Sequence, residues 1–190
     1  RVIMKFMKFQ NYTNIKIIIN TSLVFLIIFG LWASLHYVIY SWAPDYDCSY
    51  PAMLWYGIHI YGLGFIKSVI YTADNYLFSL TPIFFALFST IGVNPYTVVI
   101  TGWIIFISSG FLSGYIIWKA TKNSTLALLT IVLSLLIGIY NNTASWISYP
   151  VSHDASNMWL LINFIIAMHI FSNQGKNKYV NYILYNLLCF

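Results

Sequence analysis

The sequence predicts an all-α fold, a polytopic transmembrane helix bundle with about six complete spans and a truncated seventh. Of its 190 residues, 60% are hydrophobic and only 7% are charged, and the mean hydropathy is +0.76. A soluble domain carries about 25% charged residues, so this chain lacks the polar side chains that a water-covered surface needs. The nine Lys and Arg residues stand singly or in pairs at the ends of apolar segments. That pattern is a topology signal rather than a phosphate-binding patch, and we expect no nucleic-acid partner.

The first predicted span covers residues 17–40. It is long enough to cross about 30 Å of hydrocarbon at about 1.5 Å per residue. It is also too long for a cleaved signal peptide and lacks a small-residue cleavage site. Four basic residues precede it, Arg1, Lys5, Lys8 and Lys16. Because basic residues flank spans on the cytoplasmic side, we expect a cytoplasmic N-terminus and an outer loop at residues 41–51.

Residues 52–71 allow two interpretations, a second span or a helix lying in the outer interface. The segment contains three glycines and His59 and Lys67. If it spans, Lys119 with Lys122 and Lys176 with Lys178 face the cytoplasm, and the loops at 41–51 and 141–156 share the outer face. If it lies flat, both lysine pairs face outward, against the usual bias. The charge pattern therefore favours a span.

Four further spans are predicted at residues 77–93, 96–118, 126–140 and 157–171, with a break at Gly92-Val93-Asn94-Pro95. The apolar stretch at 179–190 is too short to cross and reads as the start of a seventh span. The sequence begins with Arg1 rather than Met. We therefore expect residues 1–190 to be a single transmembrane domain, the N-terminal part of a longer protein.

Small and polar residues inside the predicted spans indicate packing more than chemistry. Gly110 and Gly114 lie one helical turn apart, a spacing that lets a neighbouring backbone approach closely, so we expect them to pack helices. Polar groups inside a membrane usually face the bundle interior or the interface. We expect such structural positions for Asn20, His36, His59, Lys67, Asn163 and His169.

All four acidic residues are aspartates, and two of them, Asp45 and Asp47, follow the first span. Two carboxylates this close can hold a divalent cation through hard oxygen ligands. One of them could instead act as a general base on an acceptor hydroxyl. The plain alternative is a polar turn beginning at Pro44. These two residues are the candidate catalytic or metal-binding pair.

A second candidate site precedes the span at 157–171. Asp154 or Ser156 is placed to cap the helix, and the free N–H groups of a helix start attract anions. His153 could add a hydrogen-bond donor, so His153 and Asp154 are candidate substrate-binding residues. The favoured topology puts them on the same face as Asp45 and Asp47. Asp74 is a structural cap on the cytoplasmic side in that topology, and an alternative catalytic residue if 52–71 lies flat.

The order of these features resembles the N-terminal module of polytopic GT-C superfamily glycosyltransferases, membrane enzymes that use polyprenyl-phosphate-linked sugars. The resemblance covers roughly residues 17–171. It implies a catalytic or metal-linked acid at Asp45 or Asp47, with Mg²⁺ or Mn²⁺ beside the lipid phosphate, and donor or acceptor binding near His153 and Asp154. It also implies membrane lipid as a partner. The abundance of Ile, Asn, Lys and Tyr favours a bacterial plasma membrane as the location. The Asp-Glu pair and the Pro-Pro-Leu segment that many members carry are absent.

Two other classes compete with a transferase. A transporter or flippase component should carry paired charges or broken helices near the membrane midplane. A non-catalytic membrane subunit should depend only on packing at Gly110 and Gly114. The three classes differ in which substitutions should impair them: those at Asp45 and Asp47 impair a transferase, those at Asn163 and Lys67 a transporter, and those at the two glycines a non-catalytic subunit.

Overall fold

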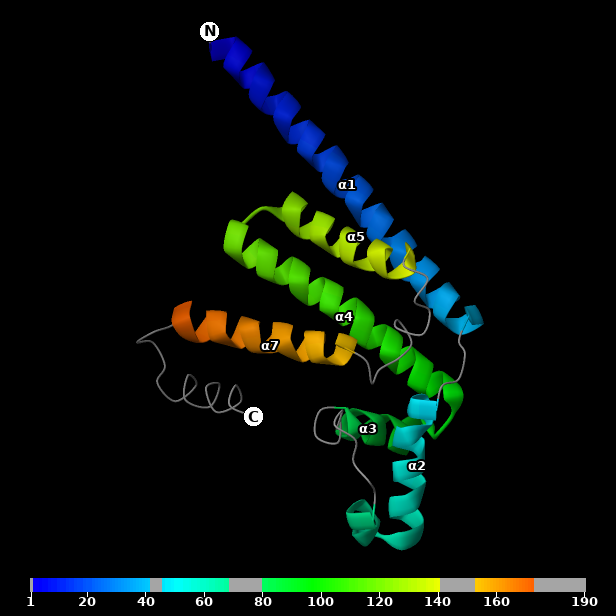
Figure 1. Cartoon of the computed structure of the whole chain (residues 1–190). Coiled ribbons are helices and arrows are strands. Elements are labelled where there is room, and N and C mark those ends of the chain that lie inside the picture. The colour runs from blue at the N-terminus through cyan, green and yellow to red at the C-terminus, as the bar shows by residue number, and fades with distance from the viewer. Residues whose placement is uncertain (1, 42–45, 69–79, 141–152, 173–190) are drawn as a thin grey trace. The chain divides into compact units, whose positions relative to one another are not determined.

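The computed structural model describes residues 2–41, 46–68, 80–140 and 153–172, and every element in these ranges is helical, which confirms the all-α prediction. The path of the chain is shown in Figure 1. In chain order the elements are α1 (Val2–Ser41), α2 (Tyr46–Tyr61), the 3₁₀ helix η1 (Leu63–Ser68), α3 (Thr81–Ile91), α4 (Pro95–Thr121), α5 (Ser124–Tyr140) and α7 (His153–Ser172).

Two of the described helices are long and apolar enough to cross a membrane, Thr13–Tyr40 within α1 and the whole of α4. Their 28 and 27 residues correspond to about 42 Å and about 40 Å of helix, more than the hydrocarbon thickness of about 30 Å. With 20 residues, α7 reaches about 30 Å. The 17 residues of α5 and 11 residues of α3 give about 26 Å and about 16 Å. Six complete spans thus stay a prediction.

The segment predicted as one span at 52–71 contains two helices. The α-helix α2 ends at Tyr61, and Gly62 follows with a φ of 72°, in the region that favours glycine. The N–H of Phe65 then donates to the carbonyl oxygen of Gly62 at 3.0 Å and starts η1. The ring of Phe65 lies against Gly57, where a methyl group would overlap it. The chain therefore turns back onto α2 instead of continuing as a single helix.

One compact unit, unit 1, comprises residues 1–33, 108–137 and 158–190. Asn20 of α1 contacts Ser124 near the start of α5, and Gly30 approaches Leu135 near its end, so α1 and α5 run parallel. Gly110 faces Ser134 and Gly114 faces Ile131, so α4 runs antiparallel to α5. The last turns of α4 and α7 line one cleft, and α7 follows the direction of α4 (Figure 1).

The second compact unit, unit 2, comprises residues 34–107 and 138–157. Val38 of α1 packs on Val99 of α4, with Trp103 beside them. The indole Nε1 of Trp103 donates a 3.0 Å hydrogen bond to Oγ of Ser34, which is fully buried. Because these pairs join the end of α1 to the first half of α4, the two helices run antiparallel. Elsewhere in unit 2, the ring of Trp55 in α2 meets Phe85 and Phe88 of α3 edge-on.

The helix boundaries follow local chemistry. The predicted break at 92–95 is confirmed: α3 ends at Ile91, Gly92 has a φ of 81°, and α4 begins at Pro95. Asn94 Oδ1 accepts the N–H of Thr97 at 2.9 Å and so caps α4. At the other end of the chain, α7 begins at His153. The prediction that Asp154 or Ser156 caps it is therefore wrong, because both residues lie inside the helix.

Candidate functional site

The side chains of the predicted catalytic and substrate-binding residues lie outside the part of the chain that the structure describes. Asp45 and Asp74 lie outside them altogether. Asp47 lies in the first turn of α2, and His153 and Asp154 lie in the first turn of α7, with the backbone described and the side chain not. The first turns of α2 and α7 both belong to unit 2. A shared site for these residues stays a prediction.

The predicted divalent-cation site also depends on side chains that the structure does not describe. Among the described side chains, no three His, Cys, Asp or Glu residues lie close enough to hold a metal ion together. The candidate ligands Asp45 and Asp47 are not among those side chains. Binding of Mg²⁺ or Mn²⁺ by this pair stays a prediction.

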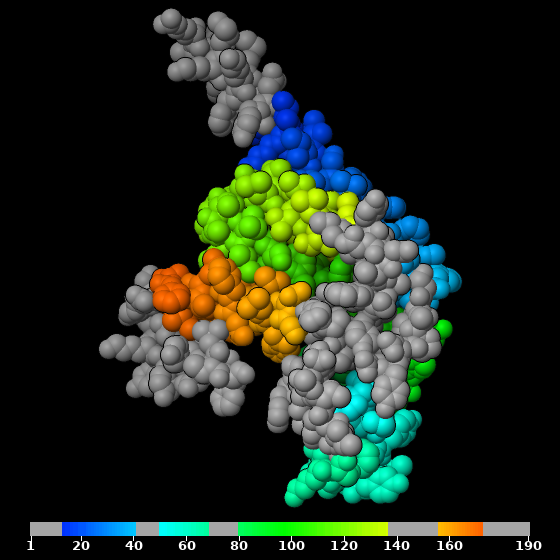
Figure 2. Space-filling model, in the orientation of Figure 1, coloured from blue at the N-terminus to red at the C-terminus, as the bar shows by residue number. Residues whose placement is uncertain are grey.

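A cleft of about 290 Å³ lies in unit 1 between the last turns of α4 and α7. Its lining combines three apolar side chains with a hydroxyl, an ammonium and an imidazole: Ile165, Ile166, Met168, Tyr115, Lys119 and His169. Figure 2 shows the end of α7 (orange) lying against the green surface of α4. Sequence reasoning missed this cleft, although Lys119 and His169 occupy matching places in the last turns of their helices.

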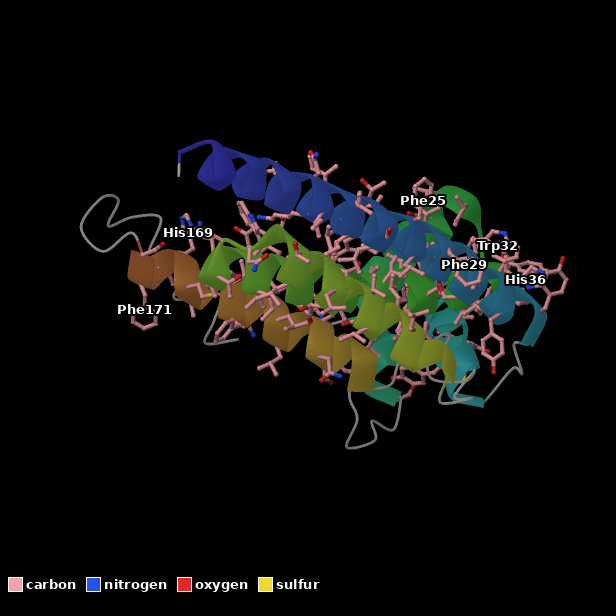
Figure 3. The ribbon with its side chains drawn as sticks, turned by 90° about the horizontal axis from the view of Figure 1, so that it is seen from above. Phe25, Phe29, Trp32, His36, His169 and Phe171 are labelled. Carbon is pink, nitrogen blue, oxygen red and sulfur yellow. The ribbon has the colours of Figure 1, made fainter. Side chains whose placement is uncertain are left out.

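Helical spacing explains the lining. Tyr115 and Lys119 are four residues apart on α4, and Ile165 and His169 are four apart on α7, so each pair lies on one face of its helix. Phe171, two residues beyond His169, points to the opposite side of α7 (Figure 3). The cleft is open at the surface, since Tyr115 and His169 are exposed. It can therefore admit a ligand from the side of the helices.

A cation in the last turn of a helix offsets the negative end of the helix dipole, and Lys119 occupies such a position in α4. Close by, the Lys122 ammonium lies 5.1 Å from the centre of the Trp118 ring. Tyr115 and Trp118 form a second ring contact, with centroids 6.0 Å apart. Basic and aromatic side chains thus gather at one end of α4, as they do where a span leaves the hydrocarbon.

Within unit 1, Asn20 joins α1 to the first turn of α5. Its Nδ2 donates to Oγ of Ser124 at 3.1 Å, and its Oδ1 accepts from Oγ1 of Thr125 at 2.7 Å. Both halves of the amide are therefore used. This arrangement agrees with a structural position for Asn20 and leaves no reason to assign it a ligand.

Two of the predicted histidines, His36 and His59, have partners within their own helices. The His36 ring lies 4.4 Å from that of Tyr40, and the His59 ring lies 4.4 Å from that of Trp55, each one helical turn away. His59 Nδ1 is also 3.1 Å from the carbonyl oxygen of Trp55. Two such pairs, each within a single helix, do not form a binding site.

No family model, no curated protein and no solved structure matches this chain.

Proposed function

We propose that this chain is a multi-pass membrane protein that transfers a sugar from a polyprenyl-phosphate-linked donor to an acceptor at the outer face of the bacterial plasma membrane. The observation that carries the membrane part is the apolar surface of α1. Ile18, Phe25 and Trp32 are 64%, 67% and 62% exposed, and Phe25, Phe29 and Trp32 follow one another along this helix (Figure 3). Soluble monomers rarely expose a continuous apolar surface of this kind, whereas lipid covers it without cost.

The directions of the helices support a cytoplasmic N-terminus. Because α1 and α5 run one way and α4 and α7 the other, the start of α1, the turn between α4 and α5, and the end of α7 share one face. That face carries Lys16, Lys119, Lys122 and His169. A basic face of this kind is cytoplasmic in most multi-pass proteins.

The same directions restrict residues 42–94. Since α1 and α4 are antiparallel, the chain between them must leave and return on one face. We therefore expect residues 52–71 and 77–93 either both to cross the membrane or both to stay at one face. The turn at Gly62 together with the short α3 favours the second arrangement.

The proposed chemistry lies on the opposite, outer face, where α1 ends and α7 begins. A carboxylate at Asp45 or Asp47 would take the proton of the acceptor hydroxyl. The hydroxyl oxygen would attack the sugar carbon, and the bond between that carbon and the lipid phosphate would break. His153 and the N-terminus of α7 would hold the phosphate. In place of the base role, Asp45 and Asp47 would together hold Mg²⁺ or Mn²⁺, and the charge of the ion would offset that of the phosphate. If neither 52–71 nor 77–93 crosses, Asp74 joins this face as the alternative base.

The test is sugar transfer in membranes containing the full chain, measured with a radiolabelled polyprenyl-phosphate-linked sugar. Asp45→Asn or Asp47→Asn should lower the rate about 100-fold or more, the usual contribution of a general base. Lys67→Gln is the control, since Lys67 is exposed on η1, and it should leave the rate unchanged. Unchanged transfer in both Asp variants, with normal membrane insertion, would contradict the proposal.

One observation favours a non-catalytic membrane subunit as the second candidate. Gly110 and Gly114 face α5 so closely that larger side chains would meet Ser134 and Ile131, and packing of this kind needs no catalytic residue. A transporter or flippase component has less support. In the two span-length helices the charged residues, Lys16 and Lys119, lie near the ends rather than at the midplane.

A further inference from the structure

We infer that the cleft between α4 and α7 binds the phosphate headgroup of an anionic glycerophospholipid from the cytoplasmic leaflet. This site is separate from the proposed transfer chemistry, whose candidate residues belong to unit 2. It rests on the same membrane placement, but it would exist whether or not the chain transfers a sugar.

The first argument is chemical complementarity. Lys119 and Tyr115, which both carry hydrogen-bond donors, line the cleft together with His169. The remaining wall, Ile165, Ile166 and Met168, is apolar. A phosphate joined to acyl chains presents the matching pair of surfaces, charge on one side and hydrocarbon on the other. Basic pockets between helices on the cytoplasmic side bind lipid headgroups of this kind.

The second argument is depth along the helix. Tyr115 lies six residues before the end of α4 at Thr121, which is about 9 Å of helix. Trp118 and Tyr115 form the aromatic pair found where helices leave the hydrocarbon. The cleft therefore lies at the level of the phosphates rather than at the midplane.

The third argument is size and access. About 290 Å³ is at the lower end of small-molecule sites, enough for a headgroup phosphate and the first carbons of its chains. The cleft opens beside two exposed side chains, Tyr115 and His169. A lipid can therefore enter the cleft from the bilayer. A ligand much larger than the cleft volume would not be enclosed.

The experiment compares spin-labelled phosphatidylglycerol with spin-labelled phosphatidylcholine around the full chain in vesicles of phosphatidylcholine, using electron paramagnetic resonance. The wild-type chain should immobilise phosphatidylglycerol in preference. Lys119→Gln should reduce that preference about tenfold, because it removes one charged hydrogen-bond donor from the cleft. Ile166→Trp fills the cleft without changing charge and should reduce it to a similar extent.

Lys16→Gln is the matched control. Lys16 is exposed on α1 near the same membrane face but does not line the cleft, so its loss should leave the preference unchanged. An equal effect of Lys16→Gln and Lys119→Gln would show a diffuse basic surface and overturn the site. A preference unaffected by Ile166→Trp in a normally folded protein would also overturn it. Displacement of phosphatidylglycerol by equimolar polyprenyl phosphate would assign the cleft to the donor lipid instead and overturn this choice of ligand.

Discussion

At the scale of single residues, polar side chains of this apolar chain form hydrogen bonds that join one helix to another. Asn20 takes part in two hydrogen bonds with Ser124 and Thr125. Trp103 donates to the buried Ser34. In a membrane these contacts replace water, which is absent from the hydrocarbon, and each helps to fix which face of a helix meets its neighbour.

The Asn20 contacts lead to a stability prediction. Asn20→Leu removes both hydrogen bonds and leaves two hydroxyl groups of α5 without this partner, so the free energy of unfolding should fall by about 1–2 kcal/mol. Titration of the purified protein from mild detergent into sodium dodecyl sulfate measures the change. Asn14→Leu is the control, since Asn14 is exposed on the same helix. Equal stability of the Asn20 variant and the wild type would contradict a structural role.

At the scale of elements, the sequence predicts the simple helices well. The helical ranges expected at 17–40, 96–118 and 126–140 match α1, α4 and α5 closely, apart from the longer ends of α1 and α4. Apolar runs that end at lysines or at an Asn-Pro pair are unambiguous, because hydropathy, charge and capping all agree there. The helix α7 was also expected, but it begins four residues earlier than predicted.

Residues 52–71 were predicted less well for a physical reason. Hydropathy averaged over such a segment cannot detect that Gly62 has a positive φ or that Gly57 leaves room for the Phe65 ring. Both features depend on where the chain goes next. The cleft was missed for a similar reason, since Tyr115 and His169 are distant in sequence and only the packing of α4 and α7 brings them together.

The α4–α5 pair gives a second stability prediction. A side chain at Gly114 would overlap Ile131 and approach the backbone oxygen of Ala127 at 3.1 Å. Gly114→Leu should therefore separate α4 from α5 and lower the free energy of unfolding by about 1–3 kcal/mol or more. Ala120→Leu enlarges an exposed residue of the same helix and should have little effect. Detergent titration of both variants compares them, and similar stability of the two would argue against close packing at Gly114.

At the scale of the whole molecule, the antiparallel and parallel helix pairs give more information on topology than hydropathy does. Hydropathy alone leaves the position of residues 52–71 open, and the two arrangements proposed above rest on the directions of α1, α4 and α5. The candidate catalytic residues Asp45 and Asp74 lie outside the described residues. Their assignment therefore still rests on sequence order and on the resemblance to the transferase module.

The two proposed arrangements place Ala73 on different sides of the membrane. If 52–71 and 77–93 both cross the membrane, residue 73 is cytoplasmic and Asp74 is a structural residue there. If neither crosses, residue 73 is on the outer face and Asp74 becomes available for catalysis. Labelling of Ala73→Cys from outside the cell distinguishes the two arrangements and decides which aspartates belong in the activity test.

The most direct test of the membrane topology is labelling of single cysteines with a membrane-impermeant maleimide in intact cells, in a background where Cys48 and Cys189 are replaced by Ser. We expect Tyr46→Cys and His153→Cys to be labelled from outside. We expect Lys122→Cys to be labelled only after the membrane is permeabilised. Labelling of residues 46 and 153 from opposite sides, or of residue 122 in intact cells, would contradict this account.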